Sequence, residues 1–439
     1  MTSSLRPFAT FATFACSLGL ASSALVACGG YLDVGNTDQG ASVRAVAARA
    51  PAVVALGTGH GCAILEDHTV ACWGFNSNGQ TGVKPDPALA DAPSGQSVRT
   101  PAIVPGLADV VQISAGWQST YALRKDGKVF GWGATRWTPG NSYEGGEDGH
   151  VPKEVPGVSD IVKVGDGGGP VCALRKDGRV VCWGRNTYKS VGPSSLPDDA
   201  SPPASLNDVL PPTIVEGITD AIDITVGDSM SCARHRDLGV SCWGRVQLVA
   251  DRWTPDDHVP VRIPGVRDAV QVAVAQGAAI ALLKDGTVVG WGDSGDQGLL
   301  FHIHGPRDPR VTSYDDGVPP APFPDLNGVV AIDGQYHTMC ALKGDGALAC
   351  WGRNDVGELG QGRTTTPLLD PQPIAGVVAE QIAVGTWNTC AVRPEGDLVC
   401  WGGGSSDALG TGRDELYAAK PDAPVRLPKA LARPGDAVP

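Results

Sequence analysis

Short runs of hydrophobic residues, bounded by glycine, proline or aspartate, recur along most of the chain. Residues 100 to 133 show the order: a proline-rich lead-in TPAIVPG, the runs DVVQIS and STYALRK, and a last run GKVFGWG. Each run is short and rich in Val, Ile and aromatic residues, which indicates β-strands rather than helices. No window outside the N-terminal region sustains the spacing of an amphipathic helix.

This order repeats seven times, and every repeat ends in Trp-Gly. The repeated tryptophans, at intervals of 48 to 60 residues, are Trp73, Trp132, Trp183, Trp243, Trp291, Trp351 and Trp401. A period of this size is typical of propellers, solenoids and arrays. Four short strands in each of seven units predict an all-β fold, a seven-bladed β-propeller of four-stranded blades, over residues 51–439.

The two ends of this region predict how the ring closes. The first unit lacks the lead-in that precedes the others, as in HVPVRIPG at residues 258 to 265, whereas the C-terminal region contains DAPVRLPKA. We therefore expect residues 424 to 428 to supply the first strand of blade one. A ring closed by this C-terminal strand leaves no terminal edge strand exposed.

Cysteines recur ten residues apart around an Asp-Gly turn. In CALRKDGRVVCWG, a three-residue loop at Lys176-Asp177-Gly178 places Cys172 opposite Cys182. This is a non-hydrogen-bonded position, where Cα atoms approach to about 4.5 Å and a disulfide is possible. The same counting gives five expected disulfides: Cys62–Cys72, Cys172–Cys182, Cys232–Cys242, Cys340–Cys350 and Cys390–Cys400.

Two repeats lack both cysteines, with Tyr121 and Gly131 in one and Ile280 and Gly290 in the other. Joint presence and joint absence are what bonded partners would show. Buried free thiols are the alternative interpretation. Zinc is disfavoured because neither the ten-residue spacing nor the sparse histidines suit a tetrahedral site.

Persistent disulfides indicate an oxidising compartment, and the N-terminal sequence agrees. Residues 1–27 contain one arginine, no acid and a long apolar stretch, which predicts a secretory signal. Leu25-Val26-Ala27-Cys28 resembles the lipobox of bacterial lipoproteins. We expect residues 1–27 to be a lipoprotein signal peptide, Cys28 to be lipidated and residues 28–50 to form a flexible tether. An ordinary cleaved signal and an uncleaved membrane anchor are the alternatives.

The net charge limits the classes of partner. With 34 Lys and Arg against 47 Asp and Glu, the chain carries a formal charge of −13 at pH 7. An acidic surface repels phosphate backbones, so nucleic acid is not an expected partner.

The repeats resemble the regulator of chromosome condensation repeat family over about residues 51 to 430. The lead-in ending in Pro-Gly, VVQISAG, ALRKDG at residues 122 to 127 and the final Trp-Gly carry the resemblance, and WGRNDVGELGQG at residues 351 to 362 is the nearest match. The founding activity of the family is nucleotide exchange on a nuclear GTPase, with a basic tail that attaches to chromatin. Similar secreted bacterial members include an inhibitor of β-lactamases, which implies that the ring can bind another protein.

The hairpin geometry also predicts a binding face. The loops before each third strand and the connections after each Trp-Gly emerge at one end of the blades, opposite the Asp-Gly turns. Aromatic residues on such loops are typical of a protein or glycan contact. Packing between the blades is the alternative. The candidates are Trp117, Trp137, Tyr143, Trp253, Tyr336, His337 and Trp387.

Catalytic and metal-binding motifs are weak. GDSG at residues 292 to 295 resembles a protease segment but follows a Trp-Gly without triad partners, and His302 and His304 lack a third ligand. Phosphate loops, zincin helices and dinucleotide fingerprints are absent from the sequence.

We therefore expect a monomeric, non-catalytic scaffold without cofactor or metal, anchored by lipid at the bacterial cell envelope or surface, that binds a protein or glycan. The alternatives are a guanine-nucleotide exchange factor for a small GTPase and an envelope hydrolase with paired carboxylates.

Overall fold

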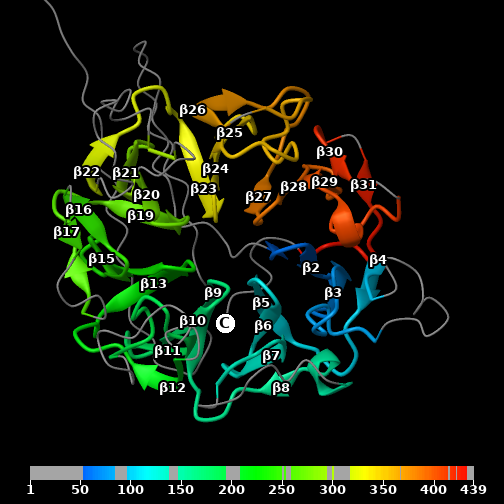
Figure 1. Cartoon of the computed structure of the whole chain (residues 1–439), viewed down its shortest axis with the longest axis horizontal. Coiled ribbons are helices and arrows are strands. Elements are labelled where there is room, and N and C mark those ends of the chain that lie inside the picture. The colour runs from blue at the N-terminus through cyan, green and yellow to red at the C-terminus, as the bar shows by residue number, and fades with distance from the viewer. Residues whose placement is uncertain are drawn as a thin grey trace, which may run out of the picture. The chain divides into compact units, whose positions relative to one another are not determined.

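The fold is a ring of antiparallel sheets. The computed structural model describes residues 53–84, 96–137, 147–193, 208–249, 252–253, 259–293, 299–300, 317–365, 367–413, 416–421 and 423–432. All of them belong to one compact unit, Val43–Pro439. Within this unit seven sheets follow one another around an axis (Figure 1), which confirms the predicted all-β, seven-bladed propeller. The predicted signal peptide, Cys28 and tether lie outside the described residues.

The first four blades contain these strands in order outward from the axis. Blade one has β1 (Val54–Leu56), β2 (His60–Ile64), β3 (Val70–Gly74) and β4 (Val98–Ile103). Blade two has β5 (Val110–Ala115), β6 (Ser119–Arg124), β7 (Val129–Gly133) and β8 (Lys153–Glu154). Blade three has β9 (Ile161–Asp166), β10 (Pro170–Arg175), β11 (Val180–Arg185) and β12 (Val209–Ile214). Blade four has β13 (Ala221–Val226), β14 (Met230–His235), β15 (Val240–Gly244) and β18 (Val261–Arg262), with a hairpin of β16 (Gln247–Val249) and β17 (Arg252–Trp253) inserted.

The last three blades follow the same plan. Blade five has β19 (Ala269–Val274), β20 (Ala278–Leu283), β21 (Val288–Asp293) and β22 (Gly317–Pro322). Blade six has β23 (Val329–Gln335), β24 (Thr338–Lys343), β25 (Leu348–Gly352) and β26 (Leu368–Pro373). Blade seven has β27 (Gln381–Val384), β28 (Asn388–Val392), β29 (Leu398–Gly403), β30 (Tyr417–Ala418) and β31 (Pro424–Val425). Among the residues described, the connections contain the short 3₁₀ turns η2 (Glu147–His150) and η3 (Ser405–Asp407).

The proline-rich lead-ins belong to the preceding blade, which corrects the predicted order of strands. β4, which contains Pro101, pairs with β3 and forms the outer edge of blade one. In the same way β31 pairs with β29, so Pro424–Val425 lies in blade seven and is not the first strand of blade one. Proline cannot donate a hydrogen bond to a second neighbour, and an outer edge strand is the position that tolerates it.

Residues further along the C-terminal region do reach blade one. Leu431 forms a bridge with Leu65, and the Glu66 N–H donates to the Ala430 carbonyl at 2.9 Å. Leu431 is also buried in the hydrophobic cluster of blade one. The C-terminal segment therefore closes the ring in blade one as expected, but through this bridge, after it has completed blade seven.

The Asp-Gly turns set the register of the cysteines. The Arg175 N–H donates to the Arg179 carbonyl at 2.9 Å, and Gly178 has a φ of +86°, as the three-residue loop requires. This turn places Cys172 opposite Cys182 with their Cα atoms 4.0 Å apart. The structure joins all five predicted cysteine pairs by disulfide bonds, and the Cα separation in the other four is 4.1 Å.

The seven repeated tryptophans are fully buried, and most of them tie their blade to the preceding one. In five cases the indole N–H donates to a backbone carbonyl of the preceding blade's outer connection, at 2.8 to 3.1 Å. These donor and acceptor pairs are Trp73 and Ala408, Trp132 and Gln80, Trp243 and Ser190, Trp351 and Leu299, and Trp401 and Glu358. The bond from Trp73 joins blade one to blade seven and so helps to close the ring.

Buried asparagines hold the connections that present these carbonyls. Asn76 accepts a hydrogen bond from the Thr81 N–H at 3.0 Å and donates to the Val83 carbonyl at 2.7 Å. Asn186 and Asn354 make equivalent bonds in blades three and six. The asparagine two positions after Trp-Gly therefore folds the connection, which then supplies an acceptor to the next tryptophan.

Glycine and glutamine join neighbouring blades near the axis. Gln112 of β5 bonds to both the N–H and the carbonyl of Val164 in β9, each at 2.9 Å, although the two strands belong to different sheets. At Gly167 an added Cβ would lie 2.2 Å from the Gly227 carbonyl oxygen of the next blade. Glycine is required there because no side chain fits between the two blades.

The tryptophan bonds give a test of what holds the blades together. Replacing Trp243 by Phe leaves the buried Ser190 carbonyl without its donor, whereas Trp291 is equally buried but its indole N–H has no partner among the described residues. Both changes remove similar ring volume. We therefore expect Trp243→Phe to lower the free energy of unfolding by about 1–3 kcal/mol more than Trp291→Phe. Urea denaturation of the two variants measures this, and equal losses would contradict the role given to the bond.

Candidate binding face

Seven short loops between the first and second strands lie at the same end of the blades. They comprise residues 57–59, 116–118, 167–169, 227–229, 275–277, 336–337 and 385–387. In blade three the start of β10 pairs with the end of β11, so the loop before β10 lies beside the residue that follows Trp-Gly. The Asp-Gly turn is at the other end of the same hairpin, and the other blades have the same arrangement. We call these seven loops, with the residues directly after each Trp-Gly, the loop face.

One repeated hydrogen bond joins the two parts of the loop face. The residue after Trp-Gly donates its N–H to the carbonyl of the last loop residue: Arg185 to Gly169 and Arg353 to His337, both at 2.9 Å. The same bond recurs in blades one, two, four and seven. An arginine that follows Trp-Gly therefore starts beside a loop tip.

Aromatic side chains of blades six and seven meet on the loop face. The Tyr336 ring lies 6.3 Å from the Trp387 ring and 4.0 Å from the His337 ring, measured between centroids. The Arg353 guanidinium carbon lies 4.0 Å from the centre of the Trp387 ring, within the range of a cation–π contact. All four side chains are partly exposed. Three of the predicted binding residues are thus adjacent.

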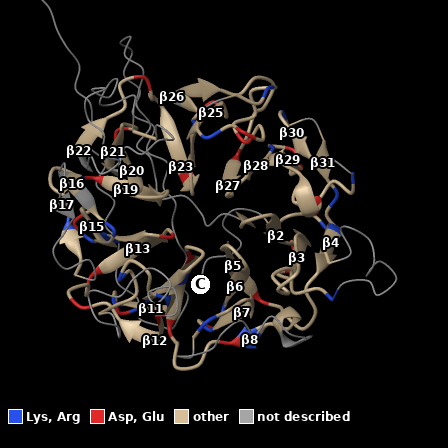
Figure 2. Ribbon diagram, in the orientation of Figure 1, with Lys and Arg blue, Asp and Glu red and all other residues tan. Residues whose placement is uncertain are grey.

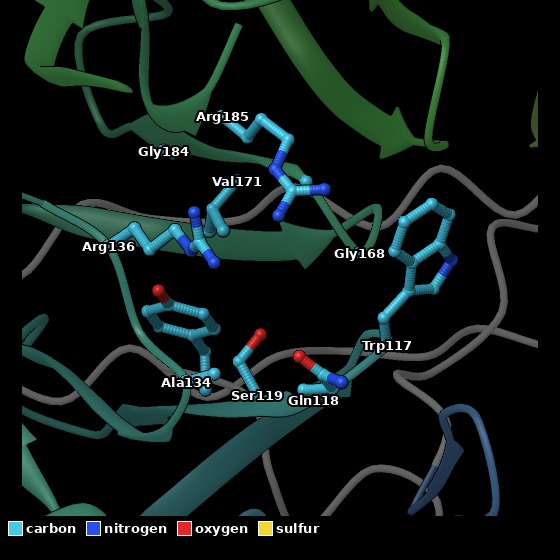
Figure 3. A pocket seen from close by; sticks show the side chains of 11 residues that line it. Trp117, Gln118, Ser119, Ala134, Arg136, Gly168, Val171, Gly184 and Arg185 are labelled. Atoms are coloured by element: carbon cyan, nitrogen blue, oxygen red, sulfur yellow. The ribbon is translucent and has the colours of Figure 1, made fainter. Parts of the chain in front are cut away.

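A pocket opens on the loop face between blades two and three (Figure 3). Trp117 lies at its mouth, over Gly168, where an added Cβ would meet the indole at 2.5 Å. Arg136, from the connection after β7, and Arg185, at the end of β11, both extend into the same opening. The pocket therefore combines an aromatic wall with two cationic groups.

Three carboxylates at the loop tips, one buried and two partly buried, have raised pKa values. Asp166, the last residue of β9, accepts hydrogen bonds from the Ser119 hydroxyl at 2.7 Å and the Gly168 N–H at 2.9 Å. Burial raises the pKa of Asp166 to about 7, although these donors oppose the rise. Burial likewise raises the pKa of Asp228 and of Asp333 to about 6 in each case. Ionising these acids works against the folded state.

The remaining aromatic candidates lie elsewhere or outside the description. Trp137 is partly buried against the hydrophobic cluster shared by blades two and three, which is the alternative that the sequence left open for it. Trp253 is in β17, but its side chain is not among those described. Tyr143, His302 and His304 fall outside the described residues.

One Ser–His–Asp array is present, at the turn end of blade four rather than on the loop face. His235 Nδ1 lies 2.6 Å from Asp220 Oδ1, and His235 Nε2 lies 2.9 Å from Ser241 Oγ. Ser241 is 6% exposed and sits between β14 and β18 in the centre of its sheet. A substrate carbonyl would not reach its hydroxyl, so we interpret the array as a structural tie across the turn.

Metal-binding clusters and membrane-spanning helices are both absent from the described part of the chain. Within it, no group of three or more His, Cys, Asp and Glu residues is placed to hold a metal ion. None of the described segments forms a helix that is long and apolar enough to cross a membrane. Charged residues of both signs are spread around the ring of blades (Figure 2).

Sequence reasoning missed the arginines and the buried acids of the loop face. Trp-Gly-Arg occurs at residues 183–185, 243–245 and 351–353, and this triplet was an available signal for Arg185 and Arg353. Arg136 and Asp166 carry no comparable local signal, because their positions depend on contacts between two blades.

Asp166 gives a prediction about pH. Its pKa is about 7 in the folded protein against a usual 3.8, so the folded state holds the proton more tightly between these values. Its contribution to stability is therefore present at low pH and lost as the pH rises towards 7. We expect the melting temperature of Asp166→Asn to fall less between pH 5 and pH 8 than that of the native protein.

Asp177→Asn is the matched control, because this exposed turn carboxylate has a lowered pKa and stays ionised across that range. Burial lowers the pKa of His60 to about 4, so below pH 6.5 this residue makes the stability of the folded protein rise with pH, opposite to Asp166. His60 is present in both proteins, and the quantity compared is therefore the difference in melting temperature between variant and native protein. Parallel curves for Asp166→Asn and the native protein would contradict the raised pKa.

Comparisons with known proteins agree with the fold. The family profile described as "Regulator of chromosome condensation (RCC1) repeat" matches residues 52–80, 110–135 and 167–189. The regulator of chromosome condensation of Mus musculus is 29% identical over 323 residues, 66% of this chain and 73% of its own length. The E3 ubiquitin-protein ligase HERC2 of Homo sapiens is 27% identical over 355 residues, 74% of this chain, and the aligned region spans 6% of its length.

Two solved structures show the same architecture. Prp20p of Saccharomyces cerevisiae superposes with a TM-score of 0.66 at 19% identity and covers 87% of this chain and 88% of its own. Human WBSCR16 superposes with a TM-score of 0.66 at 20% identity and covers 82% and 94%. The repeated sequence pattern, the seven four-stranded blades and these similarities agree: this chain carries regulator of chromosome condensation repeats, matched at residues 52–80, 110–135 and 167–189, in a propeller of the same architecture.

Proposed function

We propose that this chain is a non-catalytic scaffold that binds a protein partner through the loop face and is held outside the cytoplasm by a lipid on Cys28. The observation that carries the binding role is the set of partly exposed aromatic and arginine side chains on the loop tips. Trp, Tyr and Arg are the residues in which interface binding energy concentrates. Because the tips are fixed by rigid blades, little free energy is lost in ordering them.

Related structures support a protein as the partner. The study of Prp20p describes its binding properties to Gsp1p and histones, and yeast RCC1 (Prp20) has been solved bound to Kap60. A glycan remains the alternative occupant of the loop face, because aromatic side chains suit both.

The compartment is supported by two independent features. Five cysteine pairs lie within bonding distance in their hairpins, and such disulfides persist in oxidising compartments. The sequence of residues 1–28 has the order of a lipoprotein signal.

An exchange factor for a small GTPase is the second candidate, and the similarity to the mouse regulator of chromosome condensation favours it. Such a role requires residence with a cytosolic or nuclear GTPase, where thiols are kept reduced. The five cysteine pairs favour the extracytoplasmic scaffold instead.

The lipid anchor gives a test of the compartment. Cys28→Ala should move the protein from the membrane fraction to the soluble fraction, because it removes the site of acylation. Mass spectrometry of the native protein should show an acylated Cys28 at the mature N-terminus. Without reduction, the same measurement should show five pairs of peptides linked by disulfides. An unprocessed chain with free thiols would contradict the proposal and support the exchange factor.

Partner capture tests the loop face. Trp117→Ala combined with Trp387→Ala should weaken capture of the partner from an envelope extract by tenfold or more, since each removes an aromatic anchor worth about 2 kcal/mol. Val378→Ala is the matched control, because Val378 is 55% exposed but lies against Gly346 in an Asp-Gly turn, at the opposite end of the blades. Unchanged capture by the double variant, or a large fall in its melting temperature, would show that the two tryptophans are structural.

A further inference from the structure

Two arginines from different blades reach the pocket between blades two and three. Arg136 comes from the outer connection of blade two, and Arg185 ends the third strand of blade three (Figure 3). Their guanidinium groups face the same opening, although the chain as a whole has a net charge of −13. Two positive charges at one opening form a local site for an anion.

The backbone fixes where Arg185 can reach. Its N–H donates to the Gly169 carbonyl at 2.9 Å, and its side-chain stem lies against Gly169, where an added Cβ would be 3.5 Å from Arg185 Cβ. The buried Nε of Arg185 has no hydrogen-bond partner among the described residues. Because this Nε is closed to solvent, an incoming anion would meet the terminal guanidinium nitrogens, which face the opening (Figure 3).

The neighbouring polar groups are already engaged inside the protein. The Ser119 hydroxyl donates to Asp166 at 2.7 Å, and the Tyr121 hydroxyl accepts from the Trp183 indole at 3.4 Å. Trp117 forms the outer wall. The pocket therefore offers an entering group cationic donors and an aromatic face.

One internal carboxylate competes for Arg185. Asp228, in the equivalent loop of blade four, lies beside Gly169, where an added Cβ would be 3.6 Å from Asp228 Oδ1. The positive charge of Arg185 opposes the rise in the pKa of Asp228, so the two groups interact. Arg185 thus already faces a carboxylate from within the protein, and a partner carboxylate would take up the same interaction from outside.

We propose that this pocket binds the carboxylate of an aspartate or glutamate side chain presented by the protein partner. The planar guanidinium matches a carboxylate with two parallel hydrogen bonds, and the Trp117 face suits the methylene groups next to it. A carboxylate fits better than a phosphate because phosphorylated segments are mainly intracellular, whereas the scaffold is proposed to act outside the cytoplasm. This inference rests on the proposed function and specifies the chemistry of its partner.

The test is an NMR titration of the folded protein that follows the arginine Nε–Hε signals. The probe is the capped tripeptide acetyl-Gly-Glu-Gly-amide, and acetyl-Gly-Gln-Gly-amide is the neutral control. The Glu peptide should shift the Arg136 and Arg185 signals with a dissociation constant on the order of 1 mM, and the Gln peptide should not. Equal shifts with both peptides would overturn the proposal.

Variants assign the site. Arg185→Gln should weaken binding of the Glu peptide about tenfold or more, because a hydrogen bond between charged groups is lost. Arg353→Gln, which changes the arginine stacked on Trp387 in blade six, should leave the affinity unchanged. Asp228→Asn should strengthen binding severalfold because it removes the competing charge. Melting temperatures confirm that each variant is folded, and equal binding by native protein and Arg185→Gln would overturn the assignment.

A sulfated disaccharide serves as the competing anion. Tighter binding of the disaccharide than of the Glu peptide at Arg136 and Arg185 would overturn the carboxylate proposal in favour of a sulfated glycan. Failure of the Glu peptide together with partner capture that still depends on Trp117 and Trp387 would reject only this inference. Loss of dependence on those tryptophans would reject the proposed function itself.

Discussion

The bond from a buried tryptophan indole to a carbonyl of the preceding blade is the interaction on which the rest of the structure depends. In five of the seven blades it crosses the junction between two sheets that share no strand pairing. Its acceptor is useful only if the outer connection is folded, and in blades one, three and six the asparagine after Trp-Gly provides that fold. In those repeats strand, connection and junction are specified together.

The same bonds explain why the loop face can serve as a binding surface. The connections are held from below by the tryptophans and from the side by the bond between the residue after Trp-Gly and the loop tip. Side chains such as Trp117, Arg185 and Trp387 therefore start from fixed positions. Their identity can vary from blade to blade, because the residues that maintain the ring lie beneath them.

The loop face also carries a cost in stability. Asp166 is buried and Asp228 and Asp333 are partly buried at the loop tips, and the raised pKa of each indicates that its ionised form is disfavoured in the folded protein. Ser119 and the Gly168 N–H compensate part of this cost at Asp166. Because ionising these acids lowers the stability of the folded protein, we attribute their presence to a role at the loop tips and not to a gain in folding stability.

Much of the fold could be predicted because its rules are local. The three-residue turn at Lys176 to Gly178 fixes which residues face each other, so the cysteine register followed from counting. The place of the lead-ins was predicted wrongly, because the sequence of a short edge strand does not determine which neighbouring strand it pairs with. Pro101 and Pro424 were an available signal for an outer edge strand.

The candidate site also contains residues whose position could be predicted from local sequence and residues whose position could not. The end of the blades that carries Trp117, Tyr336, His337 and Trp387 follows from hairpin geometry, and the structure places these residues there. The packing of Trp137, the meeting of Arg136 with Arg185 and the burial of Asp166 each depend on a contact between two blades. Neighbouring positions in the sequence do not determine such contacts.

The central claim is that the loop face, and not the turn end of the blades, meets the partner. The most direct measurement is photo-cross-linking in intact cells with a photoreactive amino acid placed at Gln118 on the loop face or at Asp345 in an Asp-Gly turn. The account predicts one discrete cross-linked protein from position 118 and none from position 345. The same adduct from position 345, with none from position 118, would contradict it.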